Sequence, residues 1–243
     1  MYGYGIHTGT SKDSDDNRVV KLQGRRLVDE GPLETLKEGF PLDEDATPED
    51  WTALANEMID EIEERSIYPL GVDAPLTLAE SGSGRPFEAL VRTPYRTPET
   101  FDPWPKKRSS MLLITRLWTE MAYLMVKERD WTLWVGEGHT LGTKLLVEVY
   151  PRLSWATLAA CRGASVHKHY GRSVQVRDDT LAALRLKFVN RDRPTKELRD
   201  AAICAVTIGK VATRTSGYLG KALERSVDDH AFGGGGVAVP WLR

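Results

Sequence analysis

The stretch Tyr68-Pro69-Leu70-Gly71-Val72-Asp73 indicates the fold class of this chain. It is an apolar run without polar alternation, which is typical of a strand buried on both faces of a parallel sheet. The run ends in an acid, and a charged group is costly to bury unless a partner compensates for it. Asp73 is therefore the first position at which a functional site is expected.

The residues before this strand predict a helix. Thr47 can cap its first turn, Pro48 suits the first helical position, and Asp50 completes a capping-box pattern. Apolar residues then recur at helical spacing as far as Ile62, with acids on the opposite face. A helix that leads directly into a buried strand is typical of α/β proteins.

The remaining elements follow from apolar patterning and turn residues. Three short strands are expected at 2–6, 18–22 and 25–28, the last two joined by a tight turn at Gln23-Gly24. Later strands are expected at 131–135, 144–149 and 237–239, the last after a break at the glycine run 233–236, and helices at 109–129, 153–161, 176–189 and 196–215. This order predicts one α/β domain over residues 1–243, with a mixed sheet flanked by helices. The first three strands would be antiparallel and the later strands parallel.

A proline-rich insertion is expected at about residues 80–108, because its prolines exclude long regular elements. Cations in this segment alternate with aromatic residues, among them Phe87 and Phe101. Cations for phosphates and rings for stacking are what single-stranded nucleic acid requires. The alternative is a loop whose aromatic residues pack onto the core.

Composition and charge narrow the functional classes. The 243 residues carry a formal net charge of -2, and a hydrophobic content of 41% is ordinary for a globular protein. The two cysteines lack metal-type spacing, the start lacks a secretory pattern, and the most apolar stretch is too short to span a bilayer. These features predict a cytoplasmic protein without a membrane partner. The glycine runs match neither a P-loop nor a dinucleotide fingerprint.

Three acids are candidate metal ligands. Asp73 and Glu148 each end an apolar strand, and Asp200 lies in the first turns of an alanine-rich helix. Ligands collect at the carboxyl ends of parallel strands, so these carboxylates could form a cage for Mg²⁺ or Mn²⁺. Each has a simpler alternative: Asp73 could cap a turn, Glu148 could pair with Arg152, and Asp200 could interact with the helix dipole.

Four motifs occur in an order that resembles a known family. They are Gly71-Val72-Asp73-Ala74-Pro75-Leu76, Glu148-Val149-Tyr150-Pro151, Asp200-Ala201-Ala202-Ile203-Cys204-Ala205 and Gly236-Val237-Ala238-Val239-Pro240. Together they are similar to the uncharacterised bacterial and archaeal family of predicted RNase H-like nucleases, over roughly residues 68–240. The resemblance implies an RNase H-like fold and metal-dependent hydrolysis of phosphodiester bonds in nucleic acid, with Asp73, Glu148 and Asp200 as catalytic metal ligands.

One position departs from that family. Its first strand resembles Gly-Ile-Asp, whereas this chain reads Gly5-Ile6-His7. His7 is a candidate fourth ligand, since histidine can ligate Mn²⁺, but it cannot bridge two ions as a carboxylate does. Asp13, Asp15 or Asp16 in the next loop could supply the missing carboxylate.

The phosphate contacts are expected in the acid-free stretch 149–177, which suits a polyanion. Arg152, Lys168 and Arg172 are the candidates for nucleic-acid binding. The alternative is that acids from elsewhere in the chain neutralise this stretch. The departure at His7 motivates a second hypothesis for the whole chain, a non-catalytic nucleic-acid or protein-binding module on a degenerate RNase H-like scaffold.

Overall fold

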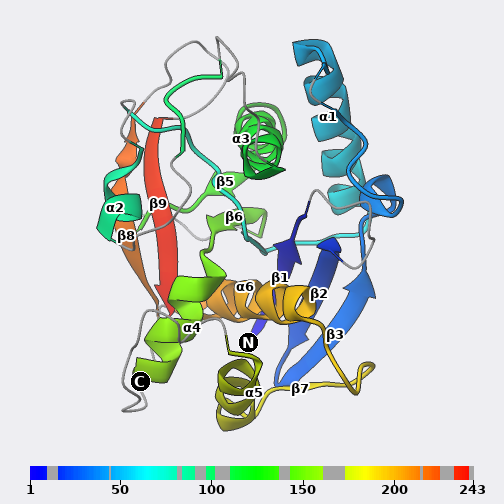
Figure 1. Cartoon of the computed structure of the whole chain (residues 1–243), viewed down its shortest axis with the longest axis vertical. Coiled ribbons are helices and arrows are strands. Elements are labelled where there is room, and N and C mark those ends of the chain that lie inside the picture. Colours follow the sequence, from blue (N-terminus) through cyan, green and yellow to red (C-terminus); the bar gives the residue numbers. More distant parts are fainter. Residues whose placement is uncertain are drawn as a thin grey trace.

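The computed structural model describes residues 1–9, 16–43, 45–80, 84–90, 97–101, 110–136, 143–160, 173–213, 216–224 and 233–240. Within these ranges the chain forms an α/β structure (Figure 1). The strands are β1 (Tyr2–His7), β2 (Arg18–Gln23), β3 (Arg26–Gly31), β4 (Leu70–Val72), β5 (Thr132–Leu133), β6 (Leu145–Glu148), β7 (Lys187–Phe188), β8 (Ser216–Glu224) and β9 (Gly233–Pro240). The helices are α1 (Pro48–Glu64), α2 (Pro86–Leu90), α3 (Ser110–Glu128), α4 (Pro151–Ala160), α5 (Val174–Ala183) and α6 (Lys196–Ala212).

Seven strands form a mixed sheet in the order β5-β6-β4-β1-β2-β3-β7. The hairpin strands β1, β2 and β3 are antiparallel, whereas β4, β6 and β5 continue the sheet from β1 in parallel. This confirms the predicted mixed sheet with an antiparallel start and parallel later strands. The turn between β2 and β3 contains Gly24 at φ +64°, a left-handed conformation that glycine adopts without strain.

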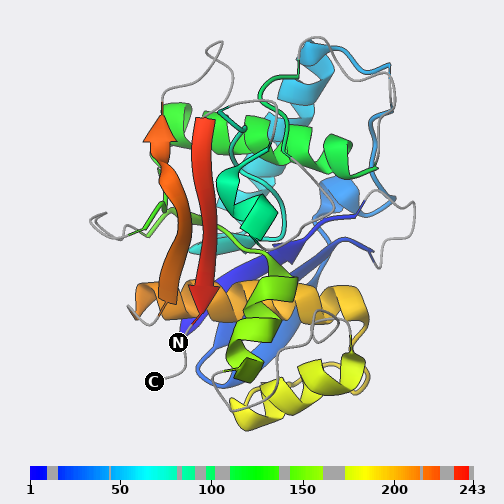
Figure 2. The ribbon, with the colours of Figure 1, turned by 60° about the vertical axis from the view of Figure 1, so that its left-hand side comes forward.

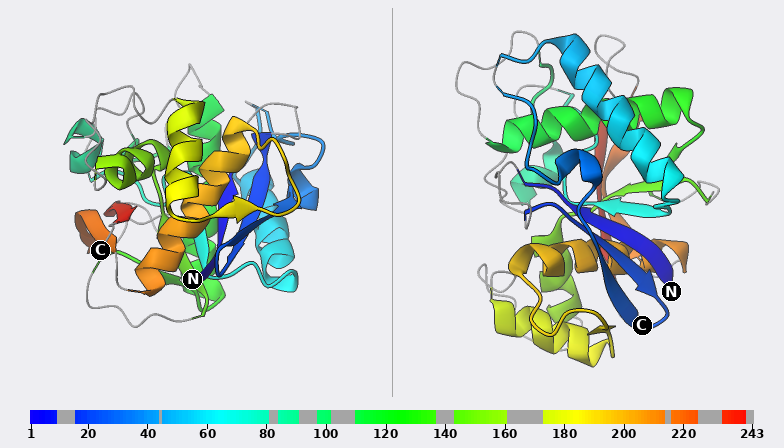
Figure 3. Two further views of the ribbon diagram at one scale, coloured as in Figure 1. Left: turned by 90° about the horizontal axis from the view of Figure 1, so that it is seen from below. Right: turned by 90° about the vertical axis from the view of Figure 1, so that its right-hand side faces the viewer.

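Helices cover both faces of this sheet. Figure 2 and the right panel of Figure 3 show α1 and α3 on one side and α6 with α5 on the other. The first face packs against α1 and α3 through Ile6, Val72 and Leu146, together with Met58 and Trp118. The opposite face packs against α6, so two apolar layers flank the sheet.

The start of α1 is the predicted capping box. The Thr47 side chain accepts a hydrogen bond from the Asp50 backbone N–H, and the Asp50 carboxylate accepts one from the Thr47 backbone N–H. Pro48 occupies the first turn. A reciprocal cap of this kind satisfies two of the backbone N–H donors left at a helix start. The first residue of this helix can therefore be predicted from the sequence.

Three predicted elements differ from the structure. The helix expected over 176–189 ends at Ala183, because Arg185 adopts a left-handed conformation (φ 57°), and the next residues form β7 against β3. The strand β8 forms directly after the last expected helix, over residues for which no element was predicted. The glycine run 233–236 lies within β9 instead of breaking the chain before it, because pairing with β8 satisfies its backbone groups.

Candidate metal site at the strand ends

The carboxyl ends of β1 and β4 bring His7 and Asp73 together. Ile6 and Val72 are paired in parallel register, so the residues that follow them lie side by side at the sheet edge. The Asp73 backbone N–H donates to the Ile6 carbonyl oxygen at 3.0 Å, which extends the ladder by one residue. His7 Nδ1 lies 2.7 Å from Asp73 Oδ2.

Helix α6 supplies Asp200 because glycines of β1 and β4 let the helix approach these two strands closely. A Cβ placed on Gly5 would lie 2.0 Å from the Ala201 carbonyl oxygen, and a Cβ on Gly71 would lie 2.6 Å from the Cys204 carbonyl oxygen. Side chains two residues apart on a strand share a face, so His7 and Asp73 project toward the same helix as these glycines. The left panel of Figure 3 shows α6 running across the sheet.

His7, Asp73 and Asp200 form one cluster. Each offers a ligand atom, and these three atoms lie within 4.8 Å of one another. The side chains of His7 and Asp73 are 17% and 18% exposed, so solvent reaches the cluster, whereas Asp200 is only 7% exposed. Two carboxylates and an imidazole from two strands and a helix could hold one divalent cation.

The Asp200 carboxylate has further partners on its buried side. The Trp155 indole N–H donates to Oδ1 at 3.0 Å, and Arg177 Nη1 lies 2.9 Å from the same oxygen. Among the described residues, the partner of Oδ2 is Lys196, whose Nζ is 3.9 Å away. Asp200 is therefore oriented through Oδ1 by α4 and α5, and Oδ2 is its more available oxygen.

The electrostatics of the cluster follow from its acids and its burial. Burial lowers the pKa of His7, but the hydrogen bond to Asp73 and the charges of Asp73 and Asp200 outweigh it, so the pKa is raised. Burial and the charge of Asp73 raise the pKa of Asp200 despite Arg177. Burial, with both aspartates nearby, raises the pKa of the Cys204 thiol well above its usual value. Cys204 is thus an unreactive part of the α6 interface.

Glu148 does not join this cluster. It is paired in register with Val72, so Val149, the residue that follows β6, lies at the level of Asp73. Successive side chains alternate between faces, and Val149 packs with Cys204 on the α6 side. Glu148 therefore projects to the face of α1 and α3. A one-residue difference in register separates it from the cluster that the sequence predicted it would share with Asp73 and Asp200.

Glu148 instead pairs with Arg85. The guanidinium contacts both Glu148 carboxylate oxygens, at 2.6 and 2.7 Å, and its Nε donates to Glu88 at 2.9 Å. The Leu76 backbone N–H and the Thr77 hydroxyl complete the network. Burial lowers the pKa of Arg85, but the charges of Glu148 and Glu88 outweigh it and raise the pKa, so the guanidinium stays charged. This network joins the segment beginning at Arg85 to the end of β6.

The structure describes one of the three residues predicted to contact nucleic acid. Arg152 is half-buried in the first turn of α4, while Lys168, Arg172, Asp13 and Asp15 lie outside the described residues. Asp16 is not in the three-residue cluster. Phe87 and Phe101, from the proline-rich segment, are buried at 4% and 8% exposure, which matches the alternative that the rings of this segment pack onto the core. The other cations and rings predicted there lie outside the described residues.

Sequence reasoning missed three residues that hold the acids in place. Arg177 and Trp155 orient Asp200, and Arg85 pairs with Glu148. Arg177 belongs to the acid-free stretch 149–177, so the alternative of neutralisation by an acid from elsewhere holds for this residue. Because burying a charged acid is costly, a buried acid is expected to have a cationic partner. The sequence separation between residues does not show which cation that partner is.

No family model, curated protein or solved structure matches this chain. Within the part of the chain that the structure describes, no helix combines the length and the apolar character needed to cross a membrane. The 19-residue α3 comes nearest in length, and it carries charged residues such as Arg116 and Glu120.

Proposed function

We propose that this chain is a nuclease of RNase H-like fold that uses a divalent metal ion held by His7, Asp73 and Asp200. The observation that carries the proposal is the convergence of three ligand atoms within 4.8 Å at the carboxyl ends of β1 and β4. The sheet supports the fold part of the proposal, because three antiparallel strands precede a parallel strand that pairs with the first.

The donor set fits one ion better than two. Asp73 Oδ1 makes no hydrogen bond or ion pair with the described residues, and Asp200 Oδ2 lies 3.9 Å from Lys196 Nζ. A second ion would need a bridging carboxylate, and the remaining acid, Glu148, is held by Arg85 on the other face. Oxygen ligands suit Mg²⁺ or Mn²⁺, and the imidazole favours Mn²⁺ of these two. When bound, such an ion supplies charge stabilisation and an activated water.

The chain's own residues have separate tasks in this proposal. Asp73 orients the His7 ring through Nδ1, while Arg177 and Trp155 fix the orientation of Asp200. Arg152, Lys168 and Arg172 remain the proposed contacts to nucleic-acid phosphates. Glu148 holds the Arg85 segment on the sheet and takes no part in metal binding. A cytoplasmic location belongs to the proposal as well, since the buried Cys204 is a free thiol.

The test is cleavage of single-stranded, duplex and hybrid nucleic acids in the presence of Mn²⁺ or Mg²⁺. We expect Mn²⁺-dependent cleavage by the wild-type chain and none by Asp73→Asn, which retains the shape of the side chain. Asp60→Asn is the matched control, because Asp60 is a half-exposed acid of α1 that pairs with Arg129. Absence of cleavage, or cleavage that survives Asp73→Asn, would overturn the proposal.

Two observations favour a second candidate, the non-catalytic binding module. His7 stands where the resembling family has an aspartate, and Arg177 already neutralises Asp200. A guanidinium beside a carboxylate supplies part of the charge compensation that a metal would otherwise provide. This candidate predicts salt-sensitive binding of nucleic acid without cleavage, because phosphate contacts dominate such affinity. Affinity that does not change with salt concentration would count against it.

A further inference from the structure

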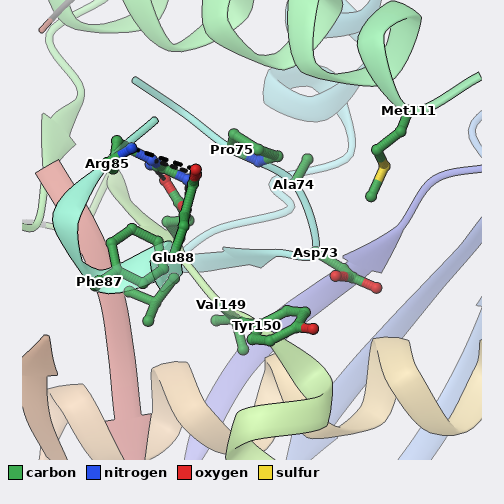
Figure 4. A pocket seen from close by; sticks show the side chains of 11 residues that line it. Asp73, Ala74, Pro75, Arg85, Phe87, Glu88, Met111, Val149 and Tyr150 are labelled. Atoms are coloured by element: carbon green, nitrogen blue, oxygen red, sulfur yellow. Dashed lines mark hydrogen bonds and ion pairs between the residues drawn. The ribbon is translucent and has the colours of Figure 1, made fainter. Parts of the chain in front are cut away.

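A pocket opens beside the metal cluster. Its empty volume is about 430 Å³, which includes space that is open to solvent. Asp73 belongs both to the lining of this pocket and to the cluster. Figure 4 shows Arg85, Phe87 and Glu88 at one end of it and Asp73 with Met111 at the other. Ala74 and Pro75 lie on one side, and Val149 and Tyr150 lie on the opposite side. An occupant of this pocket would therefore contact Asp73, one of the proposed metal ligands.

We propose that this pocket binds a nucleobase of the nucleic-acid strand whose backbone lies at the metal cluster. The inference rests on the proposed function and names the part of the substrate that is recognised. The described lining is mainly apolar, with two aromatic rings and a methionine. A flat ring that stacks on an aromatic side chain is the part of a nucleotide that such a surface accepts.

The charges of the lining disfavour the phosphate of a nucleotide. Arg85 is the cation among the described lining residues, and it is 2% exposed and paired with both Glu88 and Glu148. Asp73 adds a further acid at the opposite end. Carboxylates thus outnumber cations in the described lining. A phosphate would be repelled there, whereas an uncharged ring would not be.

Tyr150 is the ring that is available for stacking. Phe87 is 4% exposed, and the Arg85 guanidinium lies over its ring with its carbon 4.7 Å from the ring centroid. Tyr150 is only partly buried, against Phe87 and Val237, and Met111 is partly buried as well. In Figure 4 the Tyr150 ring lies along one side of the pocket, and its hydroxyl points toward the end that holds Asp73. A base on this ring would lie next to the cluster.

The experiment compares two single strands of about ten nucleotides, one with bases and one abasic throughout, so that both carry the same phosphates. Binding is measured by fluorescence anisotropy in EDTA with the full chain, and an uncharged nucleoside is titrated separately by NMR. We expect the strand with bases to bind roughly ten-fold more tightly than the abasic strand. Tyr150→Leu should remove this difference, and Tyr150→Phe, which keeps the ring, should retain it.

Each outcome decides the pocket and the proposed function separately. Equal affinity for the two strands in wild-type protein overturns the pocket inference, even if Mn²⁺-dependent cleavage is found. A preference for bases that Tyr150→Leu abolishes supports the pocket, even if no cleavage occurs. A preference that survives in a folded Tyr150→Leu variant, with an unchanged melting temperature, overturns the assignment to this pocket.

Discussion

His7 Nδ1 lies 2.7 Å from Asp73 Oδ2, across two strands whose preceding residues, Ile6 and Val72, are paired in parallel register. The contact thus depends on the backbone ladder and not on a loop. The other ring nitrogen of His7 makes no hydrogen bond with the described residues. A carboxylate that orients an imidazole in this way fixes both its tautomer and its direction.

This contact predicts a pH dependence of stability. The pKa of His7 is raised above 6.5 in the folded chain, so the folded state binds the proton more tightly than the unfolded state does. The contribution of His7 to stability is complete below pH 6.5 and is lost as the pH rises through the raised value. In EDTA, we expect the free energy of unfolding from urea titrations to fall over this range. His7→Asn should flatten the dependence, and a rise with pH would contradict the assignment.

Competition between Arg177 and a metal ion predicts the behaviour of a second variant. Arg177→Gln leaves the buried Asp200 carboxylate without its closest cation, so the metal-free protein should lose about 3–5 kcal/mol of stability. The same change removes a positive charge beside the cluster, so Mn²⁺ should raise the melting temperature more than in the wild type. Arg129→Gln, at a partly exposed ion pair on α3's C-terminal side, is the control. If Mn²⁺ changes the melting temperature of neither the wild type nor Arg177→Gln, the metal site is refuted.

The separation of Glu148 from the cluster is tested by two substitutions in one network. Arg85→Met leaves two buried carboxylates facing each other and should cost about 3–5 kcal/mol. Glu148→Gln should cost less, because Glu88 still pairs with Arg85. Calorimetric titration of Glu148→Gln should give a Mn²⁺ affinity within about three-fold of the wild type, whereas loss of a metal ligand or its support costs about 10–100-fold. A loss of that size would restore Glu148 as a ligand.

The close approach of α6 predicts unequal effects at two glycines of β1. A Cβ on Gly5 would meet backbone atoms of Ala201 and Ala205, at 2.0 and 2.3 Å, which cannot rotate away. A Cβ on Gly3 would chiefly meet the Ile208 side chain at 2.5 Å. Gly5→Ala should therefore cost about 1–3 kcal/mol more than Gly3→Ala in urea unfolding, since overpacking must be relieved by moving the helix. Equal stability costs for the two variants would show that α6 can move away from β1 without a further loss of stability.

The sequence located the elements that carry local signals. Thr47, Pro48 and Asp50 specify a helix start by themselves, and the apolar run that ends at Val72 specifies a buried strand. The strand β8 and the glycines of β9 were missed, because their pairing is stabilised by a partner strand and leaves little pattern in either segment.

The spatial grouping of the candidate residues could be predicted only in part, for a related reason. Sequence position shows that Asp73 and Glu148 both end strands, but the face on which each side chain lies depends on the register between the strands. That register pairs Val72 with Glu148, one residue short of the arrangement that a shared cluster would need. The partners Arg85 and Arg177 are far from Glu148 and Asp200 in the sequence, so only the tertiary structure identifies them.

The glycines of β1 and β4 also determine how much freedom the site retains. Because backbone rests on backbone where α6 crosses Gly5 and Gly71, the spacing between Asp200 and the strand ends cannot vary with side-chain rotamers. Histidine and aspartate have few rotatable bonds, and Asp200 is already held by Trp155 and Arg177. An ion that binds here would therefore immobilise little of the chain, and its affinity would carry only a small entropic penalty.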